Sequence, residues 1–236
     1  MIEAVLFDLD GTLLDNDMER FMRPYLQALS ARLAHIIPPA KFVECLMAGS
    51  KRMADHLHPQ LTNREVFWQT FEALSGHSEE ELQPIIDAFY AGEFNALQVY
   101  TRRRPEARPL VQSVIAAGRK AVLATHPLFP LIAVRQRMAW AGIADLPFDL
   151  ITAYENMHFC KPQPEYYDEI ARMLGAPAER CVMIGDDKVM DGPAAAAGMR
   201  FFWTTSEPPF DAARGDLAHL QRLIDDGWLD ELGRRG

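Results

Sequence analysis

Two carboxylates follow a short apolar run close to the start of the chain. The apolar residues 5–7 lead into Asp8 and Asp10, which are separated by one residue, and Gly11 comes directly after them. A short apolar run closed by a glycine is typical of a buried strand, and the two-residue period of a strand places Asp8 and Asp10 on the same side. Two ionised carboxylates this close raise one another's pKa unless a cation or several hydrogen-bond donors lie between them. We therefore expect a positive group beside this pair.

A second group of acids repeats the pattern far along the chain. Asp186 and Asp187 directly follow the apolar run 181–184, and Asp191 comes shortly after them. Asp191 has a local explanation, because it precedes a predicted short helix over 193–197 with proline in its first turn, and aspartate is a preferred N-cap residue. Local structure offers no such explanation for Asp186 and Asp187. They raise the same question as Asp8 and Asp10.

The elements that carry these acids alternate between strand and helix. From Pro105 onward, apolar runs and glycine stops predict helices over 106–117, 131–140, 164–174 and 193–197, and strands over 120–124, 148–152, 181–184 and 199–204. This alternation predicts an α/β fold, a doubly wound parallel sheet with helices on both faces, and the strand over 5–9 joins it. Ligands bind at the carboxyl ends of the strands in such a sheet, so the acids after the strands and Thr125 should converge at one edge.

A run of amphipathic helices interrupts this alternation between residues 17 and 100. Apolar residues three and four apart predict one helix through residues 21–33, and further helices are expected over 40–47, 62–74 and 78–90, with Asn63 as a candidate N-cap. After the first strand of the chain, no further strand is expected before Pro105. The methionine and aromatic side chains of the segment are expected to form its own core, with no cofactor site among them: Met47, Met53, Phe67, Trp68 and Phe71.

Four short motifs occur in a fixed order along the chain. They are Asp8-Leu9-Asp10-Gly11-Thr12, Thr125 after an apolar strand, Lys161 in Lys161-Pro162-Gln163-Pro164-Glu165, and the segment from Gly185 to Asp191. Together they resemble the four motifs of the haloacid dehalogenase-like hydrolase superfamily, and the helical insertion lies where that family places its first type of cap domain. The resemblance implies a Rossmann-like catalytic core formed by residues 1–16 and 101–236, with an inserted α-helical cap over 17–100.

The resemblance also implies a reaction. Asp8 would be the nucleophile that forms an aspartyl phosphate, and Asp10 would act as general acid toward the leaving alcohol and then as base for the hydrolytic water. Mg²⁺, a hard cation that prefers oxygen ligands, would be held by the Asp8 side chain, the Asp10 backbone carbonyl and the Asp186 carboxylate. Family members that act on halides or phosphonates carry another residue at the position of Asp10. An aspartate there favours a phosphate ester as the substrate.

The resemblance also implies that Thr125 and Lys161 are catalytic residues that bind the phosphoryl group. Thr125 can donate its hydroxyl to a phosphoryl oxygen, and Lys161 supplies a positive charge for the nucleophile and the transferring group. Asp187 and Asp191 are candidates for supporting the metal ligands. The family commonly has asparagine after the threonine of the second motif, whereas this chain has His126. His126 could bind phosphate or substrate, or be a merely packed or exposed histidine, and the sequence leaves both interpretations open.

Three functional hypotheses compete on these residues. The first is a magnesium-dependent phosphatase that hydrolyses a small phosphorylated metabolite through an aspartyl phosphate. The second is a phosphomutase of the same family, similar to β-phosphoglucomutase, which returns the phosphoryl group to a sugar. The third is a phospho-acceptor signalling module, because receiver domains also place acids, threonine and lysine around a phosphorylated aspartate. The separate 185–191 motif and the large insertion argue against the third.

Composition limits the partners of the protein. A formal net charge of −9 and a pI near 5.3 argue against nucleic acid or an anionic membrane as a partner, because both need a basic face. The basic run 102–104 is expected to be a solvated joint, and His56-Leu57-His58 a polar loop without a third metal ligand. Three scattered cysteines and the lack of a membrane-length apolar run predict a cytoplasmic protein. Monomer and homodimer stay open.

Overall fold

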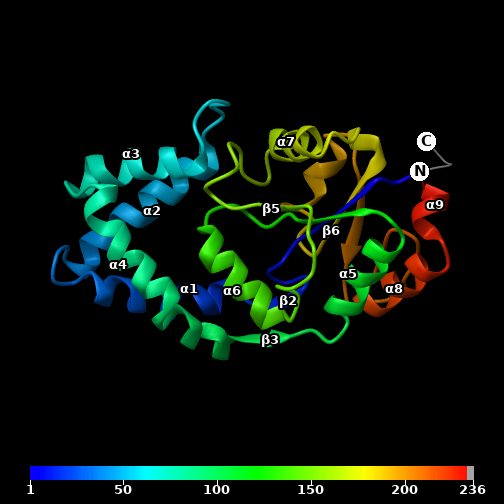
Figure 1. Ribbon diagram of the computed structural model, residues 1–236, viewed down its shortest axis with the longest axis horizontal. Coiled ribbons are helices and arrows are strands. Elements are labelled where there is room, and N and C mark those ends of the chain that lie inside the picture. Colours follow the sequence, from blue (N-terminus) through cyan, green and yellow to red (C-terminus); the bar gives the residue numbers. More distant parts are fainter. Residues whose placement is uncertain (233–236) are drawn as a thin grey trace.

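The computed structural model describes residues 1–232 of the chain and contains a central parallel sheet (Figure 1). Six strands lie in the order β5-β4-β1-β6-β7-β8, and every neighbouring pair is parallel. Their bounds are β1 Ala4–Phe7, β4 Lys120–Leu123, β5 Leu150–Ile151, β6 Cys181–Gly185, β7 Arg200–Thr204 and β8 Arg214–Gly215. The predicted doubly wound α/β fold is confirmed. The short edge strand β8 was not expected, because two residues carry no readable period.

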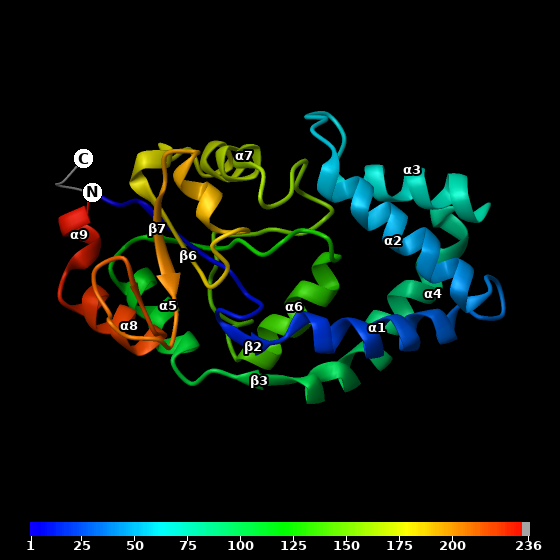
Figure 2. The same ribbon diagram turned by 180° about the vertical axis from the view of Figure 1, so that it is seen from behind.

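Helices cover both faces of this sheet. On β1, Val5 and Phe7 belong to one buried apolar cluster, whereas Ala4 and Leu6 belong to a second cluster on the opposite face. The second face is covered by α7 (Pro164–Leu174), and the first by α5 (Ala107–Ala116) and α8 (Leu217–Asp225), as Figures 1 and 2 show. A strand buried on both faces reads as a continuous apolar run, which is why β1 and β6 were recognisable from the sequence.

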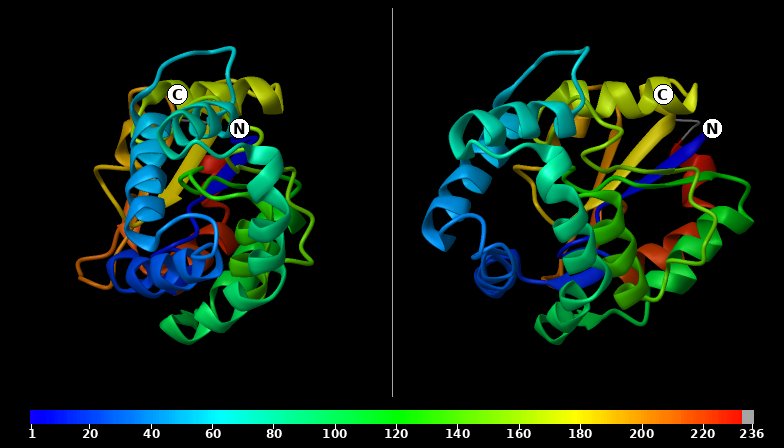
Figure 3. Two further views of the ribbon diagram at one scale, coloured as in Figure 1. Left: turned by 90° about the vertical axis from the view of Figure 1, so that its left-hand side faces the viewer. Right: turned by 60° about the vertical axis from the view of Figure 1, so that its left-hand side comes forward.

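The expected helical insertion is present beyond the carboxyl ends of the strands (Figure 3). It consists of α1 (Met18–Arg32), α2 (Pro39–Asp55), α3 (Asn63–Ser75), α4 (Glu79–Ala91) and the 3₁₀ helix η1 (Glu93–Tyr100). Thr62, and not Asn63, is the N-cap of α3: it forms a capping box with Glu65, in which the Thr62 backbone N–H donates to Glu65 Oε2 at 2.7 Å. The Asn63 side chain is buried and donates to the Phe159 carbonyl at 3.3 Å.

A two-stranded antiparallel ribbon joins the insertion to the sheet. It pairs β2 (Leu14–Asn16) with β3 (Thr101–Arg103), so the expectation of no strand before Pro105 was wrong. Strands of three residues are too short for an alternating pattern, and their partners lie far apart in the sequence. Next to the ribbon, Arg104 donates to the Gly11 carbonyl at 2.8 Å, so the basic run is not entirely solvated. The ribbon supports our proposal that the cap, residues 17–100, begins and ends here, with residues 1–16 and 101–236 forming the core; residues 233–236 lie outside the described part of the chain.

Aromatic packing fixes the cap against the core. Phe94 of η1 stacks on Trp140 of α6 (Leu131–Ala141), with ring centroids 5.3 Å apart and planes at 23°. Most of the methionine and aromatic side chains expected in the cap core are buried, but Met47 is 49% exposed. His56 is buried against Asn63 Oδ1 at 2.9 Å, in a polar loop. No helix within residues 1–232 is both long and apolar enough to span a membrane.

Candidate active site

The carboxyl ends of three neighbouring strands bring the predicted site residues to one edge of the sheet. Asp8 directly follows β1, Thr125 lies shortly after β4, and Asp186 directly follows β6. The Asp8 backbone N–H continues the ladder and donates to the Ile184 carbonyl at 2.9 Å, which fixes the direction of the Asp8 side chain. These strands are adjacent in the order β4-β1-β6, so their ends meet although the residues are far apart in the sequence.

Lys161 joins two of the acids. Its Nζ donates to Asp8 Oδ1 and to Asp191 Oδ1, both at 2.7 Å, and its side chain is 1% exposed. Asp191 is the N-cap residue of the 3₁₀ helix that follows (Gly192–Ala195), as expected, but its side chain forms no capping hydrogen bond. Instead, Asp191 Oδ2 accepts from the Asp187 backbone N–H at 3.2 Å. Asp191 is therefore held inside the site by two donors.

Three carboxylates form a group that could hold a metal ion. One carboxylate oxygen from each of Asp8, Asp186 and Asp191 lies within 4.8 Å of the others. Burial raises the pKa of Asp8 to about 8, and the Asp191 carboxylate adds to the rise while the Lys161 ammonium opposes it. Burial also raises the pKa of Asp186, whose Oδ1 accepts from the Thr12 hydroxyl at 2.9 Å.

The chemistry of this donor set fits a divalent cation. Asp8, Asp186 and Asp191 together carry more negative charge than Lys161 can neutralise, and hard divalent cations prefer carboxylate oxygens. The predicted ligands Asp8 and Asp186 are brought together here, and Asp191 joins them. The predicted contribution of Asp10 concerns its backbone carbonyl and stays a prediction.

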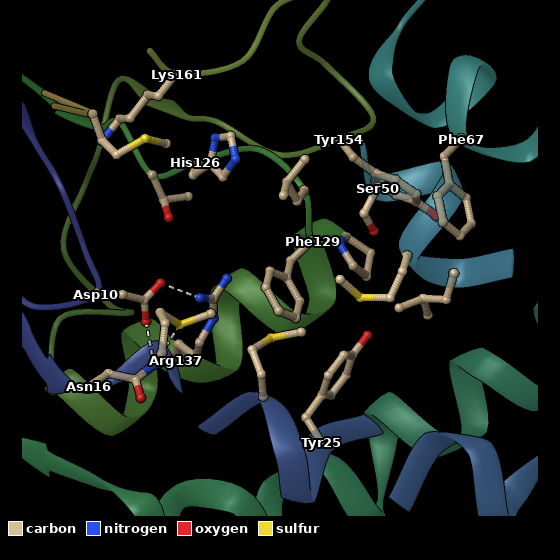
Figure 4. A pocket seen from close by; sticks show the side chains of 18 of the residues that line it. Asp10, Asn16, Tyr25, Ser50, Phe67, His126, Phe129, Arg137, Tyr154 and Lys161 are labelled. Atoms are coloured by element: carbon tan, nitrogen blue, oxygen red, sulfur yellow. Dashed lines mark hydrogen bonds and ion pairs between the residues drawn. The ribbon is translucent and has the colours of Figure 1, made fainter. Parts of the chain in front are cut away.

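The Asp10 side chain points to a different set of partners. Asp10 Oδ1 accepts from Asn16 Nδ2 at 2.7 Å, and Oδ2 is ion-paired with Arg137 Nη1 of α6 (Figure 4). Arg137 is buried, its guanidinium lies 4.5 Å from the centroid of the Phe129 ring, and its Nε and Nη2 have no hydrogen-bond partner within residues 1–232. Asp10 thus has a fixed orientation, separate from the Lys161 cluster.

Sequence reasoning did not identify Arg137 or Asn16. One signal was available, since Arg137 lies three residues after Val134 on a helix whose apolar side faces the core. A charged residue on the buried side of a helix requires a partner. The pattern alone could not have named Asp10 as that partner, because the two residues are 127 positions apart.

Thr125 and His126 form the wall opposite Asp10. The Thr125 carbonyl accepts from the Tyr166 hydroxyl at 2.8 Å and from Thr152 Oγ1 at 3.0 Å, which fixes this loop. Burial, together with the nearby Lys161 ammonium, lowers the pKa of His126 to about 3, so its ring is neutral at physiological pH. His126 Nδ1 is buried and has no partner among the described residues.

Asp187 shapes the loop that follows β6. Its Oδ1 accepts from the backbone N–H groups of Val189 at 2.7 Å and Met190 at 3.2 Å. On the other side of the loop, Trp203 Nε1 donates to the Asp186 carbonyl at 2.9 Å. Asp187 therefore holds the backbone of the loop between Asp186 and Asp191, and its supporting role at a metal site stays a prediction.

The predicted site residues line one cavity of about 610 Å³ between the core and the cap (Figure 4). Asp10, Arg137, His126 and Lys161 lie at one end of it, and Tyr25, Ser50, Phe67 and Tyr154 lie at the other. The charged end is formed by the core, whereas the cap supplies mostly apolar and aromatic side chains. A ligand in this cavity can contact the carboxylates and the cap at the same time.

Comparison with known proteins identifies the family. The family model of the haloacid dehalogenase-like hydrolases matches residues 2–198, so the chain belongs to this hydrolase family. Protein CbbY of Cereibacter sphaeroides is 27% identical over 95% of this chain and 92% of its own length, and a phosphoglycolate phosphatase of Neisseria gonorrhoeae is 28% identical over 84% and 77%. The crystal structure of a putative β-phosphoglucomutase from Thermotoga maritima shares the fold, with a TM-score of 0.55, 19% identity and coverage of 96% of this chain and 100% of that one.

Proposed function

We propose that the protein is a magnesium-dependent phosphatase that hydrolyses a small phosphate monoester through an aspartyl phosphate on Asp8. The observation that carries this proposal is the buried contact of Lys161 with Asp8 and Asp191, which lies beside Asp186 at the charged end of the cavity. Lys161 holds Asp8 and neutralises part of the charge that an anionic ester brings. The phosphatase name of one relative, 28% identical, agrees with this reaction.

The proposed reaction has two steps, formation of the aspartyl phosphate and its hydrolysis. An oxygen of Asp8 attacks phosphorus, the bond from phosphorus to the ester oxygen breaks, and Asp10 donates a proton to the leaving alkoxide. A water molecule then attacks the aspartyl phosphate and gives its proton to Asp10, and the bond between phosphorus and Asp8 breaks to release phosphate. Thr125 and Lys161 bind phosphoryl oxygens, and Arg137 and Asn16 keep Asp10 in place.

Asp8, Asp186 and Asp191 would hold the magnesium ion, with the Asp10 backbone carbonyl as the fourth proposed contact. When bound, Mg²⁺ neutralises the charge that builds up between the carboxylate nucleophile and the phosphate. The neutral ring of His126 lies near Lys161 at the wall of the cavity, and its Nδ1 is available to a phosphoryl oxygen as donor or to a substrate hydroxyl as acceptor.

The lining of the cavity favours a phosphatase over the phosphomutase alternative. A sugar phosphomutase must hold an intermediate with a second phosphate group away from the nucleophile, which calls for cations on the cap. Within the described part of the chain, the lysine and arginine residues that line the cavity are Lys161 and Arg137, and both belong to the core. A receiver-like signalling role is supported still less, because the cavity encloses a substrate-sized volume next to Asp8.

Phosphate release and label transfer test this function. Purified protein should release inorganic phosphate from monoesters with magnesium present, and Asp8→Asn protein should not. An enzyme phosphorylated on Asp8 with a radioactive label should pass the label to water. Transfer of most of the label to a sugar phosphate would support the phosphomutase, and a stable phosphoprotein without turnover would support the signalling module.

The cellular location, the partner and the oligomeric state of the protein stay predictions. Cys45, Cys160 and Cys181 are all buried free thiols, which supports the expected location in the reducing cytoplasm. The expected partner is a small phosphorylated metabolite, with no role for nucleic acid or a membrane surface. Sedimentation of the purified protein would decide between a monomer and a homodimer.

A further inference from the structure

The cap half of the cavity is lined mainly by apolar and aromatic side chains. We call it the cap chamber and define it by six side chains from α1, α2 and α3: Tyr25, Leu29, Phe42, Leu46, Phe67 and Phe71. All six are buried in the structure, and all six line the same cavity as Asp8 and Asp10. A substrate held at Asp8 must therefore extend its leaving group toward this chamber.

Few polar groups are available in the cap chamber. The Tyr25 and Tyr90 hydroxyls are hydrogen-bonded to each other at 2.8 Å, and burial raises the pKa of Tyr25 to about 12, so this pair is neutral. The Ser50 and Tyr154 hydroxyls are further polar groups at this end (Figure 4). Trp68 also lines the cavity, and its buried indole N–H has no hydrogen-bond partner among the described residues. A sugar or polyol would lose its hydrogen bonds to water here and would find few replacements, which is costly for each unpaired hydroxyl.

The size of the cavity also favours a substrate with an apolar body. Its volume of about 610 Å³ lies within the range of about 300–1,000 Å³ that encloses a drug-sized molecule. The phosphoryl group occupies only the charged end, near Lys161 and Asp8. A leaving group as small as glycolate would leave the cap chamber unfilled, whereas an apolar body would gain free energy for each group that it buries there.

We infer that the substrate of this enzyme is the phosphate monoester of an apolar alcohol, whose alkyl or aromatic body fills the cap chamber. This inference rests on the proposed phosphatase function and names its substrate class. Phosphate binds at the charged end, the ester oxygen lies near Asp10, and the apolar body lies among Phe42, Phe67 and Phe71. The charge of the substrate is then concentrated at one end, as it is in the cavity itself.

A series of linear alkyl phosphates of increasing length tests the inference. Because each buried methylene contributes about 0.8 kcal/mol, kcat/KM should rise about fourfold per added methylene until the chamber is full. Phosphoglycolate and sugar phosphates should be poorer substrates than octyl phosphate by about 100-fold or more, which equals several such methylenes. An alkyl phosphate with a terminal hydroxyl should lose much of the gain of its parent.

Two variants of Ser50 locate the effect in the chamber. Ser50→Phe places a ring at the cap end of the cavity, so the chain length that gives the highest kcat/KM should become shorter, and kcat/KM should fall far more for octyl phosphate than for ethyl phosphate. The matched variant Ser50→Ala adds no volume and should keep the wild-type optimum. Calorimetric titration of Asp8→Asn protein with octyl phosphate is a second measurement, and binding should show a negative heat-capacity change that grows with chain length.

The outcomes separate this inference from the proposed function. If phosphoglycolate or a sugar phosphate is preferred, with activity that Asp8→Asn abolishes, the phosphatase stands and the apolar substrate is refuted. A flat chain-length series, or the same optimum in Ser50→Phe, also overturns the inference. If the wild-type protein with magnesium releases phosphate from no ester in the series or the metabolite panel, the proposed function fails and the substrate class fails with it.

Discussion

Replacing Arg137 with methionine removes the buried charge that pairs with Asp10. Methionine is similar in length and apolar, so it can fill most of the same buried space between Asp10 and Phe129. The variant loses the ion pair to Asp10 Oδ2 and the contact of the guanidinium with the Phe129 ring, and it keeps the hydrogen bond from Asn16 to Asp10 Oδ1. It therefore asks what Arg137 contributes to the position of Asp10.

The loss of stability follows from the burial of the pair. Removing one partner of a buried ion pair costs about 3–5 kcal/mol. The Asp10 side chain is 11% exposed and keeps its bond to Asn16, so the lower end, about 3 kcal/mol, is expected. For a chain of this size, that corresponds to a fall in Tm of about 6–12 °C.

The loss of activity should depend on the leaving group. If Asp10 protonates the departing alkoxide, a misplaced Asp10 should lower kcat/KM for an alkyl phosphate by about 100-fold, at the lower end of what acid–base catalysis contributes. An aryl phosphate with an acidic phenol needs no such proton, so its kcat/KM should change by less than about fivefold. Steady-state phosphate release for the two esters, measured on protein shown to be folded at the assay temperature, gives the comparison.

A control variant and two outcomes make the test decisive. Arg108 forms a surface pair with Asp145, so Arg108→Met should lower stability far less than Arg137→Met and should leave both esters unaffected. An equal loss for the alkyl and the aryl ester, or a gain for the alkyl ester, would refute the view that Arg137 acts by positioning Asp10 as an acid.

Three further predictions concern Asp8 and its surroundings. Asp8→Asn should keep the circular dichroism spectrum of the wild type and lose phosphatase turnover at least 1,000-fold, as expected on the scale of a lost nucleophile; near-normal turnover would remove Asp8 from its proposed role. Chelation of divalent metal should abolish activity, magnesium should restore it and calcium should restore it poorly, because calcium prefers more ligands at longer distances; full activity in chelator would contradict the metal site. Because the folded-state pKa of Asp8 is raised to about 8, above its ordinary value, the proton on Asp8 stabilises metal-free protein at low pH, and this contribution is lost as pH rises through about 8. Tm of metal-free wild type should therefore fall between about pH 4 and about pH 8 more steeply than Tm of Asp8→Asn, and parallel curves would show that Asp8 is not the titrating group.

The sequence by itself determined the class of fold and predicted most of the residues that meet at the candidate active site. Apolar runs such as residues 4–7 and 181–184 are readable because a parallel sheet buries its strands on both faces. Once the strands are parallel, their carboxyl ends lie on one edge, so Asp8 and Asp186 have to converge. Local periodicity and capping residues also located the α-helices of the insertion to within a few residues at most of their ends. Two predictions fell short, because α2 continues to Asp55, well beyond its expected end at residue 47, and the 3₁₀ helix η1 was not expected.

Only the tertiary structure decided how the side chains are paired. Asp191 was expected both to cap a helix and to support the metal ligands, and packing directs its side chain to Lys161. Arg137 had no predicted role, and packing pairs it with Asp10. Such partners are chosen by the directions of side chains from elements far apart in the chain, and a buried charge takes the nearest opposite charge that the fold supplies. The apolar character of the cap chamber has the same origin. Its side chains read as ordinary helix cores, and only the placement of the cap over the strand ends turned Phe42, Phe67 and Phe71 toward the catalytic cavity.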